Sequence, residues 1–294
     1  MEEGISEQAW LALLDARSSG LLDRADAIET VDTRDRLANV STFGEQGYDM
    51  IVTIGAGMTD ETIAAAQLFG DLRFIAVQQS PEAGSGPDNV ALLLFHEERS
   101  GFLAGSAAAL ISQTRHVAAV CEAEFIDAIR RSCEGFRAGA AYVDSTVAVE
   151  VTYRSGSQEL LFHDVEWARA ATLLALDGGA DVVFAVGEET AEAALATAAG
   201  RGALVIGAET DQYAHSPEIR TQLATSAVLD VRSAVRSILE ETIAGRFPAG
   251  ENWGRVGLAP LHDLEGRIPP HAVTMLQTIA NDLEAGVIDI GTAH

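Results

Sequence analysis

The sequence predicts an α/β protein built on parallel β-sheets, and three features of the chain support this prediction. Short apolar runs rich in β-branched residues alternate with longer amphipathic or alanine-rich segments through most of the 294 residues. These short runs are apolar along their whole length, which is typical of strands covered on both faces. They also end in glycine or polar residues. The pattern therefore predicts a doubly wound arrangement, with helices on both faces of each sheet.

The predicted elements follow one another at short intervals along the chain. We expect strands at Ala27–Val31, Met50–Ile54, Arg73–Val77, Val90–Phe95, His116–Val120, Val147–Tyr153, Asp181–Val186 and Ala203–Gly207. We expect helices at Thr59–Phe69, Phe102–Ser112, Phe125–Tyr142, Val165–Asp177, Glu189–Ala199, Val231–Ala244 and His271–Glu284. Residues 213–230 and 245–270 interrupt this alternation, and we interpret the interruptions as crossings between two lobes.

The charge balance excludes several classes of function. The chain has 44 acidic and 19 basic residues and a formal net charge of -25, and every basic residue is an arginine. A Schiff-base lysine and a Walker-type phosphate-binding lysine are therefore excluded. Nucleic acid is an unexpected partner, because phosphate binding needs a basic surface. The histidines show no metal-ligand spacing, so we expect neither a metal nor a cofactor.

The two cysteines, Cys121 and Cys133, do not form the framework of a disulfide-rich protein. Cys121 ends a predicted strand, and Cys133 falls in the predicted helix that follows it. We expect two buried free thiols in preference to a bridge or a catalytic pair.

Polar residues follow the predicted strands at the edge where such sheets bind ligands. The pattern recurs in TIGAG (53–57), AVQQS (76–80), AVCEAE (119–124), FAVGEE (184–189) and VIGAETD (205–211). We expect Glu209 and Asp211 to face a crevice and to orient a ligand there. For Glu188 and Glu189, capping of the following helix explains the acids equally well.

Over nearly its whole length, the sequence resembles the basic membrane protein family of ABC-transporter substrate-binding lipoproteins, which includes purine nucleoside receptors. The resemblance rests on the order and spacing of EQGYDMIVTIGAG, DLRFIAVQQS, NVALLLFHEERSGFLAGSAAAL, EGFRAGAAYV, VTYRSGS, GGADVVFAVG, VIGAETDQ and LATSAVLD. It implies a type I periplasmic-binding fold, in which two Rossmann-like lobes joined by three crossings close on a ligand. Lobe one is then expected at residues 1–114 plus 226–247, and lobe two at 115–225 plus 248–294.

The resemblance also implies a monomeric, non-enzymatic protein that captures a small molecule and delivers it to an ABC permease. The full-length form is expected to be an extracytoplasmic, membrane-anchored lipoprotein. The chain as given begins at the family's first helix, and neither a leader with its lipobox nor the family's first strand precedes it. If the protein starts here, we expect lobe one to lack a central strand and to be either unstable or completed by another segment.

Departures from the family pattern predict an altered ligand. Ile5, Ser6 and Glu7 stand where the family has an aromatic ring and an asparagine, and Ser157 stands where it has a second ring. Aromatic faces stack on bases, so their loss predicts weaker base binding. The remaining candidate contacts come from both lobes: Gly55, Gln78, Glu122, Glu124, Gly187, Glu188, Glu209 and Asp211.

Carboxylates accept hydrogen bonds from hydroxyls and pair with cations, so we expect a nucleoside-like, polyol-like or cationic ligand. Phe125 could supply replacement stacking, but a buried phenylalanine at the start of a helix is the favoured interpretation. A cytoplasmic ligand-sensing regulator with the same fold is the alternative function. An enzyme is disfavoured, because TIGAGMTDE lacks the third glycine of a dinucleotide loop and no Ser-His-Asp set can be assembled.

Overall fold

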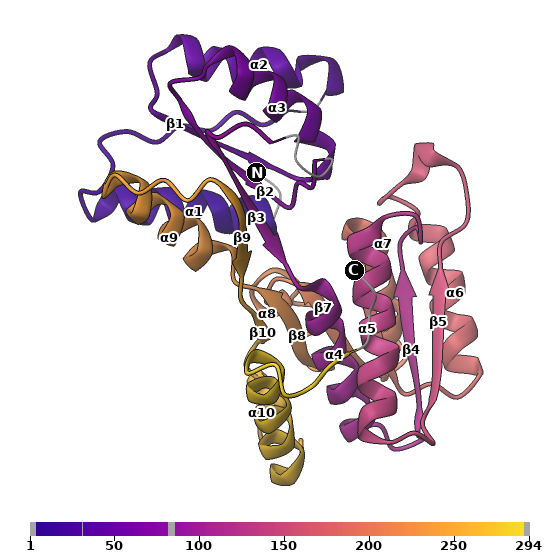
Figure 1. Cartoon of the computed structure of the whole chain (residues 1–294). Helices are drawn as coiled ribbons and strands as arrows, with labels where there is room; N and C mark the ends of the chain where they lie inside the picture. Colours follow the sequence, from indigo (N-terminus) through magenta and orange to yellow (C-terminus); the bar gives the residue numbers. More distant parts are fainter. Residues whose placement is uncertain (1–3, 31, 82–85, 291–294) are drawn as a thin grey trace. The chain divides into compact units, whose positions relative to one another are not determined.

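The structure is a computed structural model that describes residues 4–30, 32–81 and 86–290. The chain divides into two compact units, which Figure 1 shows in sequence colours. The first unit contains the described residues of Met1–His96 together with Asp230–Arg255. The second contains Glu97–Leu229 and the described residues of Val256–His294. The chain therefore passes three times from one unit to the other.

The first unit is built on a four-stranded parallel sheet in the order β1-β2-β3-β9. Its strands are β1 (Met50–Ile54), β2 (Arg73–Val77), β3 (Val90–Phe95) and β9 (Gly250–Gly254). Helices α2 (Arg36–Glu45) and α3 (Thr59–Leu68) cover one face with apolar side chains. Helix α9 (Val231–Ile243) packs against β3 and β9, and α1 (Ile5–Ser18) packs against α9. Short 3-10 turns, η1 (Thr33–Asp35) and η2 (Ala56–Met58), precede α2 and α3.

The second unit is built on a six-stranded sheet in the order β10-β8-β7-β6-β4-β5. Its strands are β4 (His116–Cys121), β5 (Ala148–Tyr153), β6 (Val182–Val186), β7 (Leu204–Glu209), β8 (Leu223–Leu229) and β10 (Val256–Leu258). Only β10 is antiparallel to its neighbour. The helical elements are α4 (Glu97–Ile111), α5 (Asp127–Val143), η3 (Gln158–Leu160), α6 (Val165–Asp177), α7 (Glu188–Gly200), α8 (Gln212–His215), η4 (His262–Leu264) and α10 (Pro270–Glu284).

Successive residues of the central strands serve opposite faces of this second sheet. Val117 and Ala119 of β4 pack into the cluster formed with α4, α5 and α10, whereas Ala118 and Val120 pack into the cluster formed with α6 and α7. Both faces are therefore buried, which explains why the strand reads as a continuous apolar run. The prediction of a doubly wound α/β fold with parallel sheets is confirmed.

Helices α4 and α5 approach each other so closely that only glycine fits at their contact. A Cβ added at Gly101 or Gly105 would lie 1.8 or 1.9 Å from the carbonyl oxygens of Ser132 and Phe136. Gly135 and Gly139 of α5 meet α4 in the same way. This packing places α4 in the second unit, whereas the division expected from the sequence assigned residues 97–114 to the first. The glycines of SGFLAG and EGFRAG are thus explained by helix packing.

The cysteine prediction is wrong, because Cys121 and Cys133 form a disulfide. Cys121 ends β4, and α5 returns over the same face of the sheet, so that the two Cα atoms lie 6.6 Å apart. Both side chains are fully buried. The sequence suggested burial correctly, but it gave no measure of how closely the helix returns to the strand.

The predicted strand at Ala27–Val31 is also wrong for residues 27–30, which form no strand, and Val31 lies outside the described residues. Ile28 is 41% exposed, so this run has no neighbouring strand or core to bury it. Conversely, β8, β9, β10 and α2 were not predicted. β8 carries buried polar residues, such as Thr225, whose hydroxyl donates to the Ala259 carbonyl oxygen at 2.7 Å. The edge strand β9 has the polar sequence GENWG.

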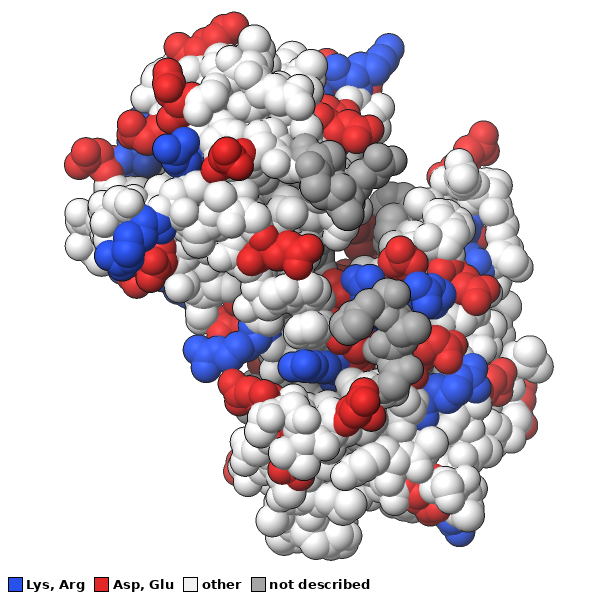
Figure 2. All heavy atoms as spheres, in the orientation of Figure 1, with Lys and Arg blue, Asp and Glu red and all other residues white. Residues whose placement is uncertain are grey.

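No helix within the described ranges combines the length and the apolar character that crossing a membrane requires. Figure 2 shows acidic side chains spread over the visible face, with arginines between them. Many arginines among the described residues form exposed ion pairs, such as Arg169 with Glu166 at 2.9 Å. Exposed pairs of this kind contribute little to stability.

Candidate ligand-binding site

Five of the predicted contact residues share an uncommon backbone conformation at the carboxyl ends of strands. Their φ angles are positive: 91° at Gly55, 53° at Gln78, 126° at Gly187, 48° at Glu188 and 65° at Glu209. Residues other than glycine rarely adopt positive φ angles, and backbone strain of this kind is concentrated at functional sites. The conformation turns the chain sharply away from the sheet and leaves polar groups at its edge.

In the first unit, Gly55 and Gln78 extend the sheet by one residue before the chain turns. The Gly55 amide donates to the Val77 carbonyl oxygen, and the Gln78 amide donates to that of Leu93, both at 2.9 Å. Gln78 itself is half-buried. Ser6 and Glu7 lie in the first turn of α1, the helix that packs against α9.

The sequence analysis missed Gln79, the neighbour of Gln78. Its side chain is 1% exposed and its Nε2 donates to Thr53 Oγ1 at 3.0 Å. Among the described residues, the Gln79 Oε1 atom has no hydrogen-bond partner. A buried amide oxygen without a partner is costly, so it is an acceptor available to a ligand or a water molecule.

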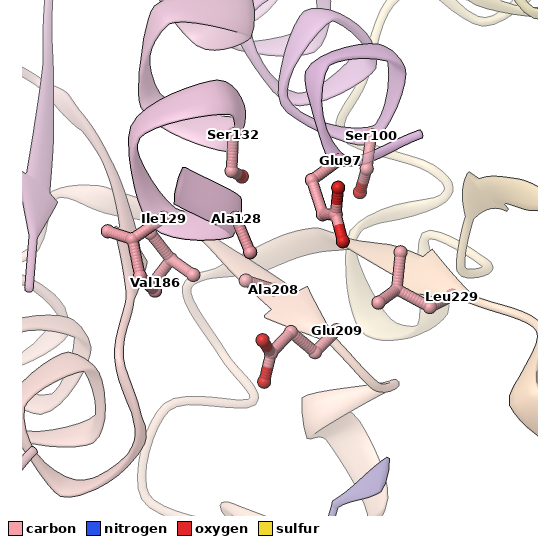
Figure 3. A pocket seen from close by; sticks show the side chains of 9 residues that line it. All are labelled: Glu97, Ser100, Ala128, Ile129, Ser132, Val186, Ala208, Glu209 and Leu229. Atoms are coloured by element: carbon pink, nitrogen blue, oxygen red, sulfur yellow. The ribbon is translucent and has the colours of Figure 1, made fainter. Parts of the chain in front are cut away.

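In the second unit, a pocket lies where α4, α5, β6 and β7 meet. The empty space at this pocket, including the open solvent at its mouth, is about 280 Å³. Figure 3 shows its lining: Glu97, Ser100, Ala128, Ile129, Ser132, Val186, Ala208, Glu209 and Leu229. Apolar side chains with a few polar groups are the usual lining of a small-molecule site. Glu209 is the predicted contact residue that this pocket contains.

The carboxylates of this pocket are close enough to perturb one another. Burial, followed by the nearby carboxylates of Glu188 and Glu97, raises the pKa of Glu209 to about 7. Burial also raises the pKa of Glu97, although the Arg131 guanidinium opposes this effect. Arg131 donates to Glu97 Oε2 through Nη2 at 2.7 Å and through Nε at 3.1 Å. Acids with raised pKa values in a pocket are typical of functional sites.

Glu122 lies in a buried network instead of lining this pocket. Its side chain is 0% exposed and lies 3.3 Å from Arg154 Nη1, and its Oε2 accepts from the Phe162 amide at 3.1 Å. Arg154 Nε also bonds Asp164 Oδ2 at 3.0 Å. Gly187 is required beside this network, because a Cβ there would lie 2.4 Å from that of Glu122. The structure therefore gives Glu122 a set of protein partners that leaves it inaccessible to a solute.

Asp211 has protein partners as well. Its Oδ1 accepts from the Tyr213 amide at 3.2 Å, which caps α8, and its Oδ2 lies 2.8 Å from His262 Nε2. Glu188 begins α7 and is exposed, in agreement with a place at a helix N-terminus. Glu124 and Ser157 are exposed, and the Ser157 carbonyl oxygen accepts from Arg154.

Phe125 differs from the favoured expectation, since its side chain is 67% exposed. Helix α5 begins at Asp127, so Phe125 precedes the helix instead of packing under its first turn. The exposed ring follows the carboxyl end of β4, where a ligand-stacking role stays a prediction.

Glu97, Ser100 and Ser132 were not among the predicted contacts. A signal for the first two was present, because the apolar run VALLLF is followed by HEERS, the same change from apolar to polar residues that marks the other strand ends. Ser132 carried no such signal, because it lies in the middle of a helix. Within the described part of the chain, no group of His, Cys, Asp and Glu could hold a metal ion.

Comparisons with known proteins agree with this architecture. The chain is 27% identical over 230 residues to the ABC transporter nucleoside-binding protein BmpA of Lactococcus lactis, covering 74% of this chain and 63% of the relative. It is 26% identical to Basic membrane protein A of Borreliella burgdorferi, covering 68% of this chain and 57% of the relative. The chain thus spans less than two thirds of the length of these relatives.

A solved structure with the same fold is an ABC transporter solute-binding protein from Conexibacter woesei. Its TM-score is 0.77 at 22% identity, and the match covers 97% of this chain and 93% of that one. The family model described as "ABC transporter substrate-binding protein PnrA-like" matches residues 3–258. This chain therefore belongs to the Bmp family of PnrA-like ABC transporter substrate-binding proteins.

Proposed function

We propose that this protein is the substrate-binding component of an ABC importer and captures a small polar solute. The observation that carries the proposal is the pocket beside Glu209, where buried carboxyl and hydroxyl groups meet apolar walls in a chain of this family. Gly55, Gln78 and Gln79 offer further polar groups at the strand ends of the first unit. The solute classes that fit are nucleoside-like, polyol-like and cationic compounds. We propose no chemical reaction on the solute.

A ligand panel tests this proposal. Thermal denaturation of the purified protein is followed with nucleosides, sugars and polyols, and cationic amines, and native mass spectrometry identifies any solute that copurifies. At least one class is expected to raise the melting temperature and to be recovered with unchanged mass. The proposal fails if no class does so and no solute copurifies. If purine nucleosides alone bound tightly, the predicted change of specificity would be wrong.

We further propose that the protein works outside the cytoplasm, in partnership with an ABC permease. The buried disulfide between Cys121 and Cys133 supports this, because structural disulfides persist in oxidising compartments and are rare in the cytosol. A cytoplasmic ligand-sensing regulator would instead hold both cysteines reduced. To separate the two functions, native cells are lysed in a denaturant that contains an alkylating reagent, and the alkylated cysteines of the protein are counted. The disulfide leaves both cysteines unmodified, whereas a reduced cytoplasmic protein is alkylated at both.

Solute capture by closure of the two units also stays a proposal, based on the family resemblance. A decrease in the radius of gyration on addition of a bound ligand, measured by small-angle scattering, is the expected result. An unchanged radius with the ligand bound would contradict closure.

A further inference from the structure

We propose that the solute carries a positively charged nitrogen, an amine or an amidine, and that the pocket lined by Glu97, Ser100, Ser132 and Glu209 receives it. This inference rests on the proposed function and narrows its ligand class. The pocket has three features that favour such a group: an excess of negative charge, two hydroxyls in its wall and apolar surroundings.

The pocket has more carboxylates than cations to balance them. The negative charges of Glu97 and Glu188 both disfavour ionisation of Glu209. Arg131 is the basic group at this place, and both of its hydrogen bonds go to Glu97, while its Nε lies 3.9 Å from Glu98. The described residues provide no arginine or histidine partner for the Glu209 carboxylate. A cationic group of the ligand would therefore supply the missing charge.

Two hydroxyl groups in the pocket wall are ready to accept hydrogen bonds. Ser100 and Ser132 are only 4% and 6% exposed, and both line the pocket. They come from facing helices, and Figure 3 shows them on either side of the Glu97 side chain. An ammonium group has three N–H donors and no acceptor, so it matches a carboxylate with neighbouring hydroxyls.

The apolar walls decide between a charged and a neutral group. Ile129, Val186 and Leu229 line the same pocket, and apolar walls lower the local dielectric. A low local dielectric strengthens the attraction between a carboxylate and a cation, and it makes an uncompensated carboxylate costly. A neutral hydroxyl would satisfy hydrogen bonds but would leave the excess charge in place. A phosphate or carboxylate group would be repelled.

Matched pairs of probes that differ in charge test the inference by isothermal titration calorimetry. The pairs are putrescine and butanediol, glucosamine and glucose, and adenosine with its ribose primary hydroxyl either kept or replaced by an amine. N-acetylglucosamine is the control that keeps the nitrogen but removes its charge. In at least one pair, the cationic member is expected to bind at least tenfold more tightly than its neutral partner.

Two variants connect this preference to the pocket. Glu209→Gln keeps the shape of the side chain and is expected to reduce the preference for the cation at least tenfold. Replacing Ser100 and Ser132 together by alanine should weaken binding of the cationic probe. The cationic probe should still bind more tightly than its neutral partner, because Glu209 is unchanged. Glu166→Gln is the control, because it removes the same charge at an exposed position on α6. It should leave the affinity unchanged.

The pH dependence provides a readout that a purely structural effect would not produce. Glu209 must be ionised to pair with a cation, so the affinity should rise as the pH passes through about 7 in the wild type and should lose this rise in Glu209→Gln. The charged groups around it are Glu97 and Glu98 of α4, Arg131 of α5 and Glu188 of α7. Neutral members that bind as tightly as their cationic partners would overturn this inference and leave the proposed function intact. Binding by no member of any pair, together with a negative ligand panel, would overturn both.

Discussion

The raised pKa of Glu209 predicts that its replacement by glutamine stabilises the protein at alkaline pH. In the folded protein this pKa is about 7, against an ordinary value of 4.5. Because the folded state holds the proton more tightly, the contribution of Glu209 to stability is fully present below about pH 4.5. It is lost as the pH rises through about 7, where the partly buried carboxylate must ionise near Glu97 and Glu188. Glutamine at this position stays neutral and avoids this loss.

The size of the effect follows from the interval between the two pKa values. At 1.36 kcal/mol for each pKa unit, the interval corresponds to at most about 3 kcal/mol. Since the Glu209 side chain is only partly buried, solvent screening reduces the expected value to about 1–2 kcal/mol.

Urea unfolding of the ligand-free wild type and of Glu209→Gln, at about pH 5 and about pH 8, measures this difference. The two proteins should have similar free energies of unfolding at the lower pH, and the variant should be more stable by about 1–2 kcal/mol at the higher pH. Glu166→Gln is the control, and its difference from the wild type should not depend on pH. A Glu209→Gln variant that is no more stable at the higher pH would refute the reasoning.

Three further predictions concern the framework of the second unit. Gly105→Ala should destabilise the protein by at least about 2 kcal/mol, because the added Cβ would lie 1.9 Å from a backbone oxygen of α5. The control is Gly200→Ala, in open space at the end of α7, which should be neutral or slightly stabilising. Equal urea midpoints for the two variants would contradict the helix packing. Reduction of the disulfide should lower the free energy of unfolding by about 3 kcal/mol for the 12-residue separation of its cysteines. Unchanged stability after confirmed reduction would refute this value. Arg154→Met should cost about 3–5 kcal/mol by leaving Glu122 buried without its cation. The double variant with Glu122→Gln should recover part of that loss in thermal and urea unfolding, and no recovery would argue against the ion pair as the cause.

Many strands and helices of both units were predictable because their sequence patterns are local. The helix at Val165–Asp177 has the predicted bounds, and the strand candidates from Met50 to Gly207 lie within two residues of the observed strands. Elements whose burial depends on distant partners were not predictable in this way. β8 carries Thr225 and Ser226 in the core, because Ala259 and Gln212 satisfy their hydroxyls. Residues 27–30 looked like a strand but have no neighbour to pair with.

The candidate site was also predictable only in part from the sequence. The change from apolar to polar residues at the strand ends predicted Gly55, Gln78, Gly187, Glu188 and Glu209, and each of them has a positive φ angle in the structure. The same pattern could not separate an accessible carboxylate from one that is already paired. Glu122 and Asp211 also lie at the carboxyl ends of strands of the second sheet, as Glu209 does, yet they form ion pairs with Arg154 and His262.

The sequence by itself determined the alternation of strands and helices, the absence of lysine chemistry and the edge of each sheet at which polar groups gather, because period, composition and strand ends are properties of neighbouring residues. Only the tertiary structure decided which carboxylates remain available, that α4 belongs with α5 and that the two cysteines meet. Each of these depends on the distance between segments far apart in the chain. The four glycines at the α4–α5 contact illustrate the reason: their sequence permits close approach, but only the folded partner shows what approaches.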